Sequence, residues 1–506
     1  MKPIFSWTWV LPDGMDAAVL LLFCFAGAVS MLLLLVQRHH RAILPGLIHV
    51  AGGILAALSA DLITLLVAWE ILTFSAFFLL LQSRTGEARR AASLYLVVQI
   101  IAAALYFVAA LLHFNETGTL RTGGLAAEGL VPAAQPFMAL AVLIKTAGIP
   151  FHFWLVRAYP VAALPITPLL SAFTTKVGVV TAARLVRFSP GGVPLFAWAG
   201  ALTALVAVVL ALRQHQVRRL LSYHLISQVG YMTAAVGMAG MTVDTAMVGT
   251  ATRAGLFHLV THTLYKALLF MVAAEAARSF VAPGGGPQEE LPLMGGLARK
   301  RPILCVLGVI GAAAISGVPF TSGYASKELL KHAVGGGAPG LLLQLASVGT
   351  GLSFLKFLWM IFWAPAKSPI TLPSRTRRAI CLVPAFLVAV ATVLIGLRPT
   401  LVPGIDSWSG FSGPSLGAAL LPLGGSLLLW VRFRARLVAQ GRPVSLPAGA
   451  GPDPARVMFR LATEQISRQG SRLAGALKAW HRWGPQSQLL LALATVVLLG
   501  FLVATL

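Results

Sequence analysis

The stretch "HLVTHTLYKALLF", residues 258–270, places three ionisable side chains inside an otherwise apolar run. His258, His262 and Lys266 follow one another at intervals of four residues, so in an α-helix they share one face. A charged group at the centre of a bilayer costs about 2.5–3.5 kcal/mol on insertion scales. This face must therefore look towards protein or trapped water, and the helix must lie within a bundle.

The composition of the chain indicates an all-α integral membrane protein. Of its 506 residues, 58% are hydrophobic and only 11% are charged, which is far less charge than a soluble protein of this length carries. Helices satisfy their own backbone hydrogen bonds in lipid, and no alternating ten-residue strand pattern occurs. The three cysteines lie in apolar runs and indicate neither disulfides nor a metal site. The N-terminal stretch lacks the features of a cleaved signal peptide.

About fourteen apolar spans have the length that a bilayer crossing requires. They are placed at residues 17–36, 43–60, 62–82, 91–112, 136–159, 167–187, 193–213, 220–240, 253–277, 302–332, 339–364, 379–397, 413–431 and 487–506. Before the last span, residues 455–483 alternate apolar and basic side chains at helical spacing. This pattern predicts an amphipathic helix along the membrane surface, which either touches only lipid or braces neighbouring helices or another subunit.

The net charge of +24 is concentrated in alternate connections between these spans. The basic connections include "QRHHR", "SRTGEARR", "RQHQVRR", "ARKR" and "KSPITLPSRTRR". The positive-inside rule predicts that they face the cytoplasm, so both termini lie on the outer side of a bacterial or archaeal inner (cell) membrane. Topology and contact with anionic lipid explain the basicity, and no nucleic-acid partner is expected.

Two of the spans contain proline and glycine near their centres. The segment "LAVLIKTAGIPFHFWL" holds Gly148 and Pro150, and "GAAAISGVPFTSGYASKELL" holds Gly317, Pro319 and Gly323. Proline removes a helical hydrogen bond and clashes with the preceding turn, so both spans are expected to be broken. Interrupted spans at corresponding positions in two halves are typical of the ion path of an inverted-repeat transporter.

Ionisable side chains recur along the spans, and a functional role is the default interpretation for such groups in mid-span. The predicted proton-transfer groups are Glu70, Lys145, Lys176, His258, His262, Lys266, Lys327, Glu328 and Lys356. By contrast, Lys331, Arg253 and Arg184 lie near span ends, where long basic side chains reach the headgroups.

A proton relay fits these residue types better than a metal site does. Histidine titrates near neutral pH, and a desolvated lysine can give up its proton. The His258–His262 spacing could hold zinc, but no third ligand follows and Lys266 would repel a cation. Exchange of lysine partners by Glu70 would move protons along the row. No nucleotide, disulfide-redox or haem motif occurs, so no cofactor is expected in this chain.

At these residues the chain resembles the antiporter-like subunits shared by respiratory complex I, group 4 membrane-bound hydrogenases and multisubunit Mrp cation/proton antiporters. The resemblance covers roughly residues 50–365 and is carried, in order, by "LLVAWEILTFSAFFLL", "KTAGIPFHFWLVRAYPVAALPITPLLSAFTTKVGVV", "VRRLLSYHLISQVGYM", "GLFHLVTHTLYKALLFM" and "ISGVPFTSGYASKELL". It implies that Glu70 is the essential carboxylate, that Lys145 is its paired lysine, and that Lys176 and Lys327 are relay groups. Lysine at both 176 and 327 is most similar to the D-type Mrp subunit and its hydrogenase relatives.

The resemblance also implies two inverted five-helix repeats, each with a broken helix and half of a proton path. The expected divisions are 1–60 for N-terminal helices, 61–187 and 188–365 for the two half-channels, 366–431 for further spans, 432–486 for the amphipathic segment and 487–506 for the final span. About two spans of the family pattern are missing before the Glu70 helix. The amphipathic helix is similar to the lateral helix of the largest complex I antiporter-like subunit.

The expected function is proton translocation within a multi-subunit membrane complex, most like a Mrp-type monovalent cation/proton antiporter. Three alternatives remain open. One is a redox-driven pump resembling complex I or a hydrogenase, whose catalytic redox site would lie in other subunits. Another is a module that energises inorganic-carbon uptake. A self-sufficient carrier of a small organic substrate would need a further polar pocket. The expected partners are other membrane subunits, protons, a monovalent cation and lipid.

Overall fold

The computed structural model describes residues 14–121, 129–188, 194–239, 244–282, 285–372 and 374–439, and these residues form helices and turns with no named strand. The long helices are α1 Gly14–Val36, α2 Ile43–Leu58, α3 Leu62–Leu81, α4 Gly86–Thr117, α6 Gln135–Lys145, α7 Phe153–Val161, α8 Ile166–Phe188, α9 Pro194–Leu212, α10 Val217–Ala239, α11 Thr245–Ala277, α13 Pro302–Ser316, α14 Ser322–Val334, α15 Ala338–Leu358, α16 Arg375–Leu397 and α17 Gly413–Ala439. Short turns are η1 His40–Ala42, η2 Leu291–Leu293, α12 Leu297–Lys300, η3 Trp359–Trp363 and η4 Pro399–Leu401. The predicted surface helix at 455–483 and the last predicted span lie outside the described residues.

Ten helices in the described part of the chain are long and apolar enough to cross a membrane. The all-helical membrane fold expected from composition is therefore confirmed. Helix α10 is absent from these ten although it has 23 residues, because it carries two arginines and several other polar side chains. Almost all of its side chains are nevertheless buried, so protein rather than lipid surrounds it.

Each of the two spans with central proline consists of two helices separated by a short break. Between α6 and α7 the chain reads Gly-Ile-Pro-Phe from Gly148, and between α13 and α14 it reads Gly-Val-Pro-Phe from Gly317. Gly317 has a φ of +80°, a left-handed conformation that glycine adopts without steric cost. The helical ladder stops at both places, which frees backbone carbonyls in the middle of the bundle.

The basic connections lie together at one end of the helices, here called the basic side. The amide of Leu291 donates to the carbonyl of His215, and the amide of Thr371 donates to that of Ser279. At the opposite side, the amide of Leu62 donates to the carbonyl of Leu120. Successive spans therefore run in alternating directions, as the charge pattern predicts.

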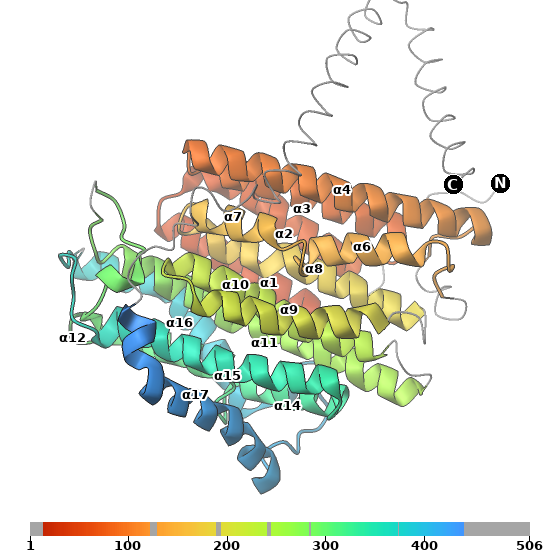
Figure 1. Ribbon diagram of the computed structural model, residues 1–506. Coiled ribbons are helices and arrows are strands. Elements are labelled where there is room, and N and C mark those ends of the chain that lie inside the picture. The colour runs from red at the N-terminus through yellow and green to blue at the C-terminus, as the bar shows by residue number, and fades with distance from the viewer. Residues whose placement is uncertain are drawn as a thin grey trace, which may run out of the picture. The chain divides into compact units, whose positions relative to one another are not determined.

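Helices α8, α10 and α11 lie inside the bundle, with α4 along one edge and α17 along another (Figure 1). Helices α8 and α11 are buried along the whole of their most apolar stretch. Helices α9 and α10 approach closely at glycines, since a Cβ at Gly200 or Gly230 would lie 2.4 Å or 2.6 Å from a backbone nitrogen of the other helix. Small residues permit such contact between membrane helices. The polar residues of α10 and α11 are thus held in the centre of the protein.

Candidate functional site: a buried row of lysines and histidines

The face of α11 that carries His258, His262 and Lys266 points into the protein. All three side chains have zero exposure. The two imidazole rings stack with centroids 6.2 Å apart, and the ring of Tyr265 packs edge-on against His262 at 5.3 Å. The four-residue spacing therefore produces a contiguous polar stripe rather than a lipid-facing surface.

His258 is held on both ring nitrogens by neighbouring helices. Its Nδ1 lies 2.8 Å from the hydroxyl of Ser326 on α14, and its Nε2 lies 3.2 Å from the amide oxygen of Gln228 on α10. The hydroxyl of Tyr265 also donates to that oxygen at 3.4 Å. His258 thus connects α11 to the second broken helix, and it interacts electrostatically with Lys327.

Several polar atoms of the row are buried without a hydrogen-bond partner among the described residues. They are the Nζ atoms of Lys176 and Lys266 and both ring nitrogens of His262. An unpartnered polar group in an apolar interior costs free energy, so such atoms normally bind internal water. Their mutual electrostatic interactions extend from α8 to α11. The row therefore has the donors and acceptors that a hydrated path requires.

At the first broken helix, Lys145 reaches α3. Its Nζ donates to the hydroxyl of Thr73 at 3.2 Å and to the carbonyl of Trp69 at 3.4 Å, and lies 4.8 Å from the centre of the Trp69 ring. Glu70 is half-buried, and its Oε1 has no hydrogen-bond partner among the described residues. Glu70 and Lys145 interact electrostatically. The two are therefore neighbours, but Lys145 is held by the hydroxyl and carbonyl of α3 rather than by the carboxylate.

At the second broken helix, Lys327 folds back on its own break. Its Nζ donates to the carbonyl of Ile315, which the break frees, at 2.8 Å and to the hydroxyl of Ser347 at 3.3 Å. Lys327 also lines a cavity of about 740 Å³ between α14, α15 and α17. The lining includes Gly335 and Pro414, which lie towards the opposite side of the bundle.

Two predicted groups lie apart from this row. The Nζ of Lys356 donates to the carbonyls of Leu212 at 3.0 Å and Gln214 at 2.9 Å, so it caps the end of α9 at the basic side. Glu328 pairs with Lys331 at 3.0 Å and with His332 at 3.5 Å instead of with a buried lysine. The sequence did not predict these contacts. Lys356 lies in an apolar stretch, and Glu328 is adjacent to Lys327, so both suggested membership of the buried row.

The groups expected to reach the headgroups also differ in their contacts. Arg184 donates to the hydroxyl of Ser59 at 2.6 Å and to the carbonyl of Ala57 at 2.9 Å, and so closes the end of α2. Arg253 is exposed on α11. A basic residue near the end of a span can therefore either bond to a neighbouring helix or lie exposed, and its position in the sequence does not distinguish the two.

Sequence reasoning missed two buried histidines next to the row. His49 on α2 and His224 on α10 each have zero exposure. His49 lies within electrostatic range of Lys145, and His224 within range of Lys266 and Lys327. Both stand alone in apolar or mixed stretches, so no spacing signal marked them.

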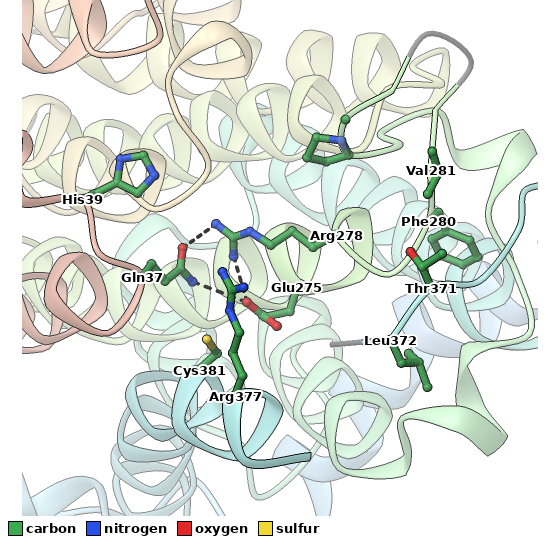
Figure 2. Close-up of a pocket in the computed structure, with 12 residues that line it drawn as sticks. Gln37, His39, Glu275, Arg278, Phe280, Val281, Thr371, Leu372, Arg377 and Cys381 are labelled. Atoms are coloured by element: carbon green, nitrogen blue, oxygen red, sulfur yellow. Dashed lines mark hydrogen bonds and ion pairs between the residues drawn. The ribbon is translucent and has the colours of Figure 1, made fainter. Parts of the chain in front are cut away.

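A separate polar cluster ties helix ends together at the basic side (Figure 2). The carboxylate of Glu275 accepts from Arg278 at 2.8 Å and from Arg301 at 3.1 Å, and Arg278 also donates to Gln37, the residue after α1. Arg377 of α16 reaches towards the same carboxylate. Gln37, Glu275, Arg278 and Arg377 line a pocket of about 580 Å³. Burial and the nearby Arg278 charge lower the pKa of His39, which also lines this pocket.

No group of three or more histidine, cysteine or carboxylate side chains in the described part of the chain could hold a metal ion. His258 and His262 stack beside Lys266 with no carboxylate or thiol between them. The arrangement is suited to proton binding, because the side chains of His258, His262 and Lys266 can each gain or lose a proton without a change in the helix.

Residues 59–353 match the family described as NADH:quinone oxidoreductase/Mrp antiporter, transmembrane. An uncharacterized protein of Mycobacterium tuberculosis is 31% identical over 323 residues, which are 60% of this chain and 49% of that protein. The chain thus spans about half the length of that curated relative. A D-type Na(+)/H(+) antiporter subunit of Bacillus subtilis is 27% identical over 374 residues, covering 70% of this chain and 72% of that relative.

The fold is also similar to a chain in the solved structure of the Mrp complex from a Dietzia species. The TM-score is 0.65 at 23% identity, over 84% of this chain and 85% of the other. The matched family segment contains both broken helices and every member of the lysine and histidine row, from Glu70 to Lys327.

Proposed function

Because the chain belongs to the NADH:quinone oxidoreductase/Mrp antiporter transmembrane family, we propose that it is the proton-translocating, antiporter-like subunit of a multi-subunit membrane complex. The observation that carries the proposal is the buried row from Lys145 through Lys176 and Lys266 to Lys327. Its central members have polar atoms without protein partners among the described residues. Lysines in that situation are neutral or stabilised by water, and either state can accept and release protons.

The proton path follows the row between the two broken helices. Glu70 and Lys145 form its first end, and Lys176 continues it on α8. His262 and Lys266 form its centre, and His258 passes it to Lys327 through the contacts on α14. The cavity beside Lys327 gives this end access to the opposite side of the membrane. Residues 61–187 and 188–365 are then two inverted half-channels of a protein with about fourteen crossings.

The surface around Glu70 supports a partner subunit there. Glu70 is half-buried in the middle of α3, and Phe74, one turn further on the same face, is 46% exposed. A carboxylate facing lipid at this depth is costly, whereas a basic or hydrated surface of another subunit would stabilise it. The predicted 455–483 helix would brace the same complex. The basic side faces the cytoplasm and both termini lie outside.

A Mrp-type exchange of protons for a monovalent cation is the favoured form of the activity. The Bacillus subtilis relative named as an antiporter subunit is matched over 70% of this chain and 72% of its own length. A redox-driven pump is the second candidate, because the family description includes NADH:quinone oxidoreductases. In that case the redox groups would lie in other subunits and this chain would move protons only.

The test is proton movement by the native complex that contains this chain, reconstituted in vesicles with an entrapped pH-sensitive dye. The proposal predicts that a Na⁺ or K⁺ gradient alone drives proton movement. Movement that requires an electron donor and quinone would favour the redox-driven form. Absence of proton movement under both conditions would contradict the proposal.

A further inference from the structure

Two histidine–serine pairs lie beside the lysine row, each between neighbouring helices. His49 Nδ1 is 2.8 Å from Ser75 Oγ on α3, and His224 Nε2 is 2.7 Å from Ser353 Oγ on α15. We propose that these pairs are proton-binding sites that connect the basic side to the row, with His49 serving Lys145 and His224 serving Lys266. The inference rests on the proposed function and extends it to His49, which lies outside the matched family segment.

The hydrogen bonds of Ser75 fix the tautomer of His49. The Ser75 hydroxyl donates its single hydrogen to the carbonyl of Ile71 at 2.6 Å. It can therefore only accept from His49, so Nδ1 of the imidazole carries the hydrogen. The Nε2 atom is then an unprotonated acceptor, and it is buried with no hydrogen-bond partner among the described residues. A vacant basic lone pair in the protein interior is a proton-binding position.

The depth of the pair places it between the basic side and Lys145. His49 lies six residues after Ile43, where α2 begins at the basic side, and Ser75 lies six residues before Leu81, where α3 ends there. At 1.5 Å per residue both are about 9 Å from those ends. Thr73, which accepts from Lys145, lies two residues deeper on α3. A proton entering from the basic side thus reaches His49 before Lys145.

The transfer requires no other reactant. A proton binds to the Nε2 lone pair and gives an imidazolium that still donates Nδ1–H to Ser75. It then passes from Nε2 to the neutral amine of Lys145, directly or through water, which forms the ammonium and restores the neutral ring. Lys145 interacts electrostatically with His49, so the two positive charges disfavour each other and occupancy alternates.

The surroundings of His49 contain few other charges. Phe173 of α8 packs its ring edge-on at 5.6 Å, and Ser75 is the contact from α3. The titratable or charged residues on the elements packed against α2 are Asp16 at the far end of α1, Cys24 on α1, His40 and Arg41 in η1, Asp61 at the start of α3, Glu70 on α3, and Lys176 and the end arginines of α8. Lys145 is therefore the cation that responds to protonation of His49.

In the second predicted half-channel, residues 188–365, His224 is likewise a buried histidine bonded to a serine near the basic side. It lies seven residues after the start of α10 at the basic side, about 10 Å deep. Its second nitrogen, Nδ1, is buried without a hydrogen-bond partner among the described residues. Ser353 is one helical turn before Lys356, whose Nζ reaches the basic-side end of α9. A line from Lys356 through Ser353 and His224 to Lys266 therefore joins the surface to the centre of the row.

The test uses the native complex in vesicles and the initial rate of proton movement against pH on the basic side. His49→Asn places an amide nitrogen at the position of Nδ1, so it can keep the hydrogen bond to Ser75, but it cannot hold a proton. We expect its rate to fall about tenfold, a modest loss for a proton-transfer group because water replaces part of the path. The pH dependence contributed by the imidazole should disappear. His224→Gln should lower the rate similarly, and the double variant should lose more than either.

His113→Gln is the matched control, because His113 is a buried histidine on α4 away from the row, and it should keep the wild-type rate and pH profile. A His49→Asn complex with the wild-type rate and pH profile would overturn the inference while leaving the proposed function intact. If that variant fails to assemble, Ser75→Ala retains the imidazole ring but no longer fixes its tautomer, and it should reduce the rate of proton movement.

A chemical rescue gives a second test. In His49→Gly, added imidazole should restore proton movement, whereas pyrazole, which is of similar size but weakly basic, should not. Equal restoration by both would indicate a packing role and overturn the inference.

Discussion

The Nζ of Lys145 is held 3.2 Å from the hydroxyl of Thr73, whereas the Oε1 of neighbouring Glu70 has no hydrogen-bond partner among the described residues. Glu70 on α3 and Lys145 at the end of α6 are thus neighbours that no hydrogen bond joins. Because Glu70 and Lys145 are near each other without a direct hydrogen bond, an ion pair between them can form or break at small energetic cost. This relationship explains how the first end of the row can respond to a partner that changes the state of Glu70.

Replacing Thr73 with valine should weaken the hold on Lys145. The substitution keeps the side-chain shape but removes the acceptor, and a hydrogen bond to a charged group contributes about 1.5–3 kcal/mol. We expect slower proton movement with normal assembly, whereas Glu70→Gln should abolish coupled movement. Thr250→Val, at an exposed position of α11, is the control and should behave as wild type. Normal rates of proton movement in both Thr73→Val and Glu70→Gln would show that Glu70 and Lys145 are not part of the proton path.

Replacing Gly178 with alanine should displace Lys145 without unfolding α8. An added Cβ would lie 2.8 Å from Thr146 Cγ2 and 3.2 Å from Lys145 Cγ. The lysine stem must therefore shift, and proton movement should fall several-fold. Gly249→Ala on α11 is the control, because its added Cβ meets nothing within 4 Å. Equal activity of the two variants would show that the position of Lys145 is not limiting.

Breaking the Glu275 cluster should destabilise the protein rather than change its proton chemistry. Glu275 and Arg301 are almost fully buried, and removing one partner of a buried ion pair typically costs about 3–5 kcal/mol. Glu275→Gln should lower the thermal unfolding midpoint of the purified complex. Glu87→Gln, at an exposed position of α4, should leave it unchanged. A normal midpoint for Glu275→Gln would mean that the contacts of Glu275 do not hold the ends of α1, α11 and α13 together.

The orientation can be measured by cysteine labelling in a variant that lacks Cys24, Cys305 and Cys381. Leu120→Cys should react with an impermeant reagent added from outside, and Gly86→Cys should not. These positions lie at opposite ends of α4, so one of them must face the reagent in either orientation. The reverse pattern would place the basic side outside the cell.

The helical class was predictable from the apolar composition of the chain. The two breaks were predictable because proline and glycine interrupt a helix locally, whatever the rest of the fold does. The inward face of the His258–Lys266 stripe was predictable because lipid excludes charge. The environment of Lys356 was not, since its contacts come from the end of α9, 142 residues or more away in the chain. His49 and His224 were missed for the same reason. A single histidine in an apolar run gains meaning only from the serine and lysine that the fold brings beside it.

The helices also show where hydropathy misleads. Helix α10 is too polar for the ten membrane-crossing candidates, yet it is among the most buried helices. Its His224 bonds to Ser353 of α15 and its Gln228 to His258 of α11, while His224 Nδ1 and Gln228 Nε2 have no hydrogen-bond partner among the described residues. The inverted-repeat arrangement and the fourteen crossings remain predictions, because they depend on relationships beyond local sequence pattern and on residues outside the described ranges.

The most direct test of the account is proton movement by the reconstituted complex carrying Lys266→Ala. Lys266 is fully buried, and its Nζ lacks a hydrogen-bond partner among the described residues, so its loss breaks no hydrogen bond there and removes only its contact with the Phe270 ring. Arg253→Ala on the exposed part of the same helix is the control. The account predicts an assembled complex in which Lys266→Ala stops net proton movement and Arg253→Ala does not. Wild-type movement in an assembled Lys266→Ala complex would contradict the central role of the row.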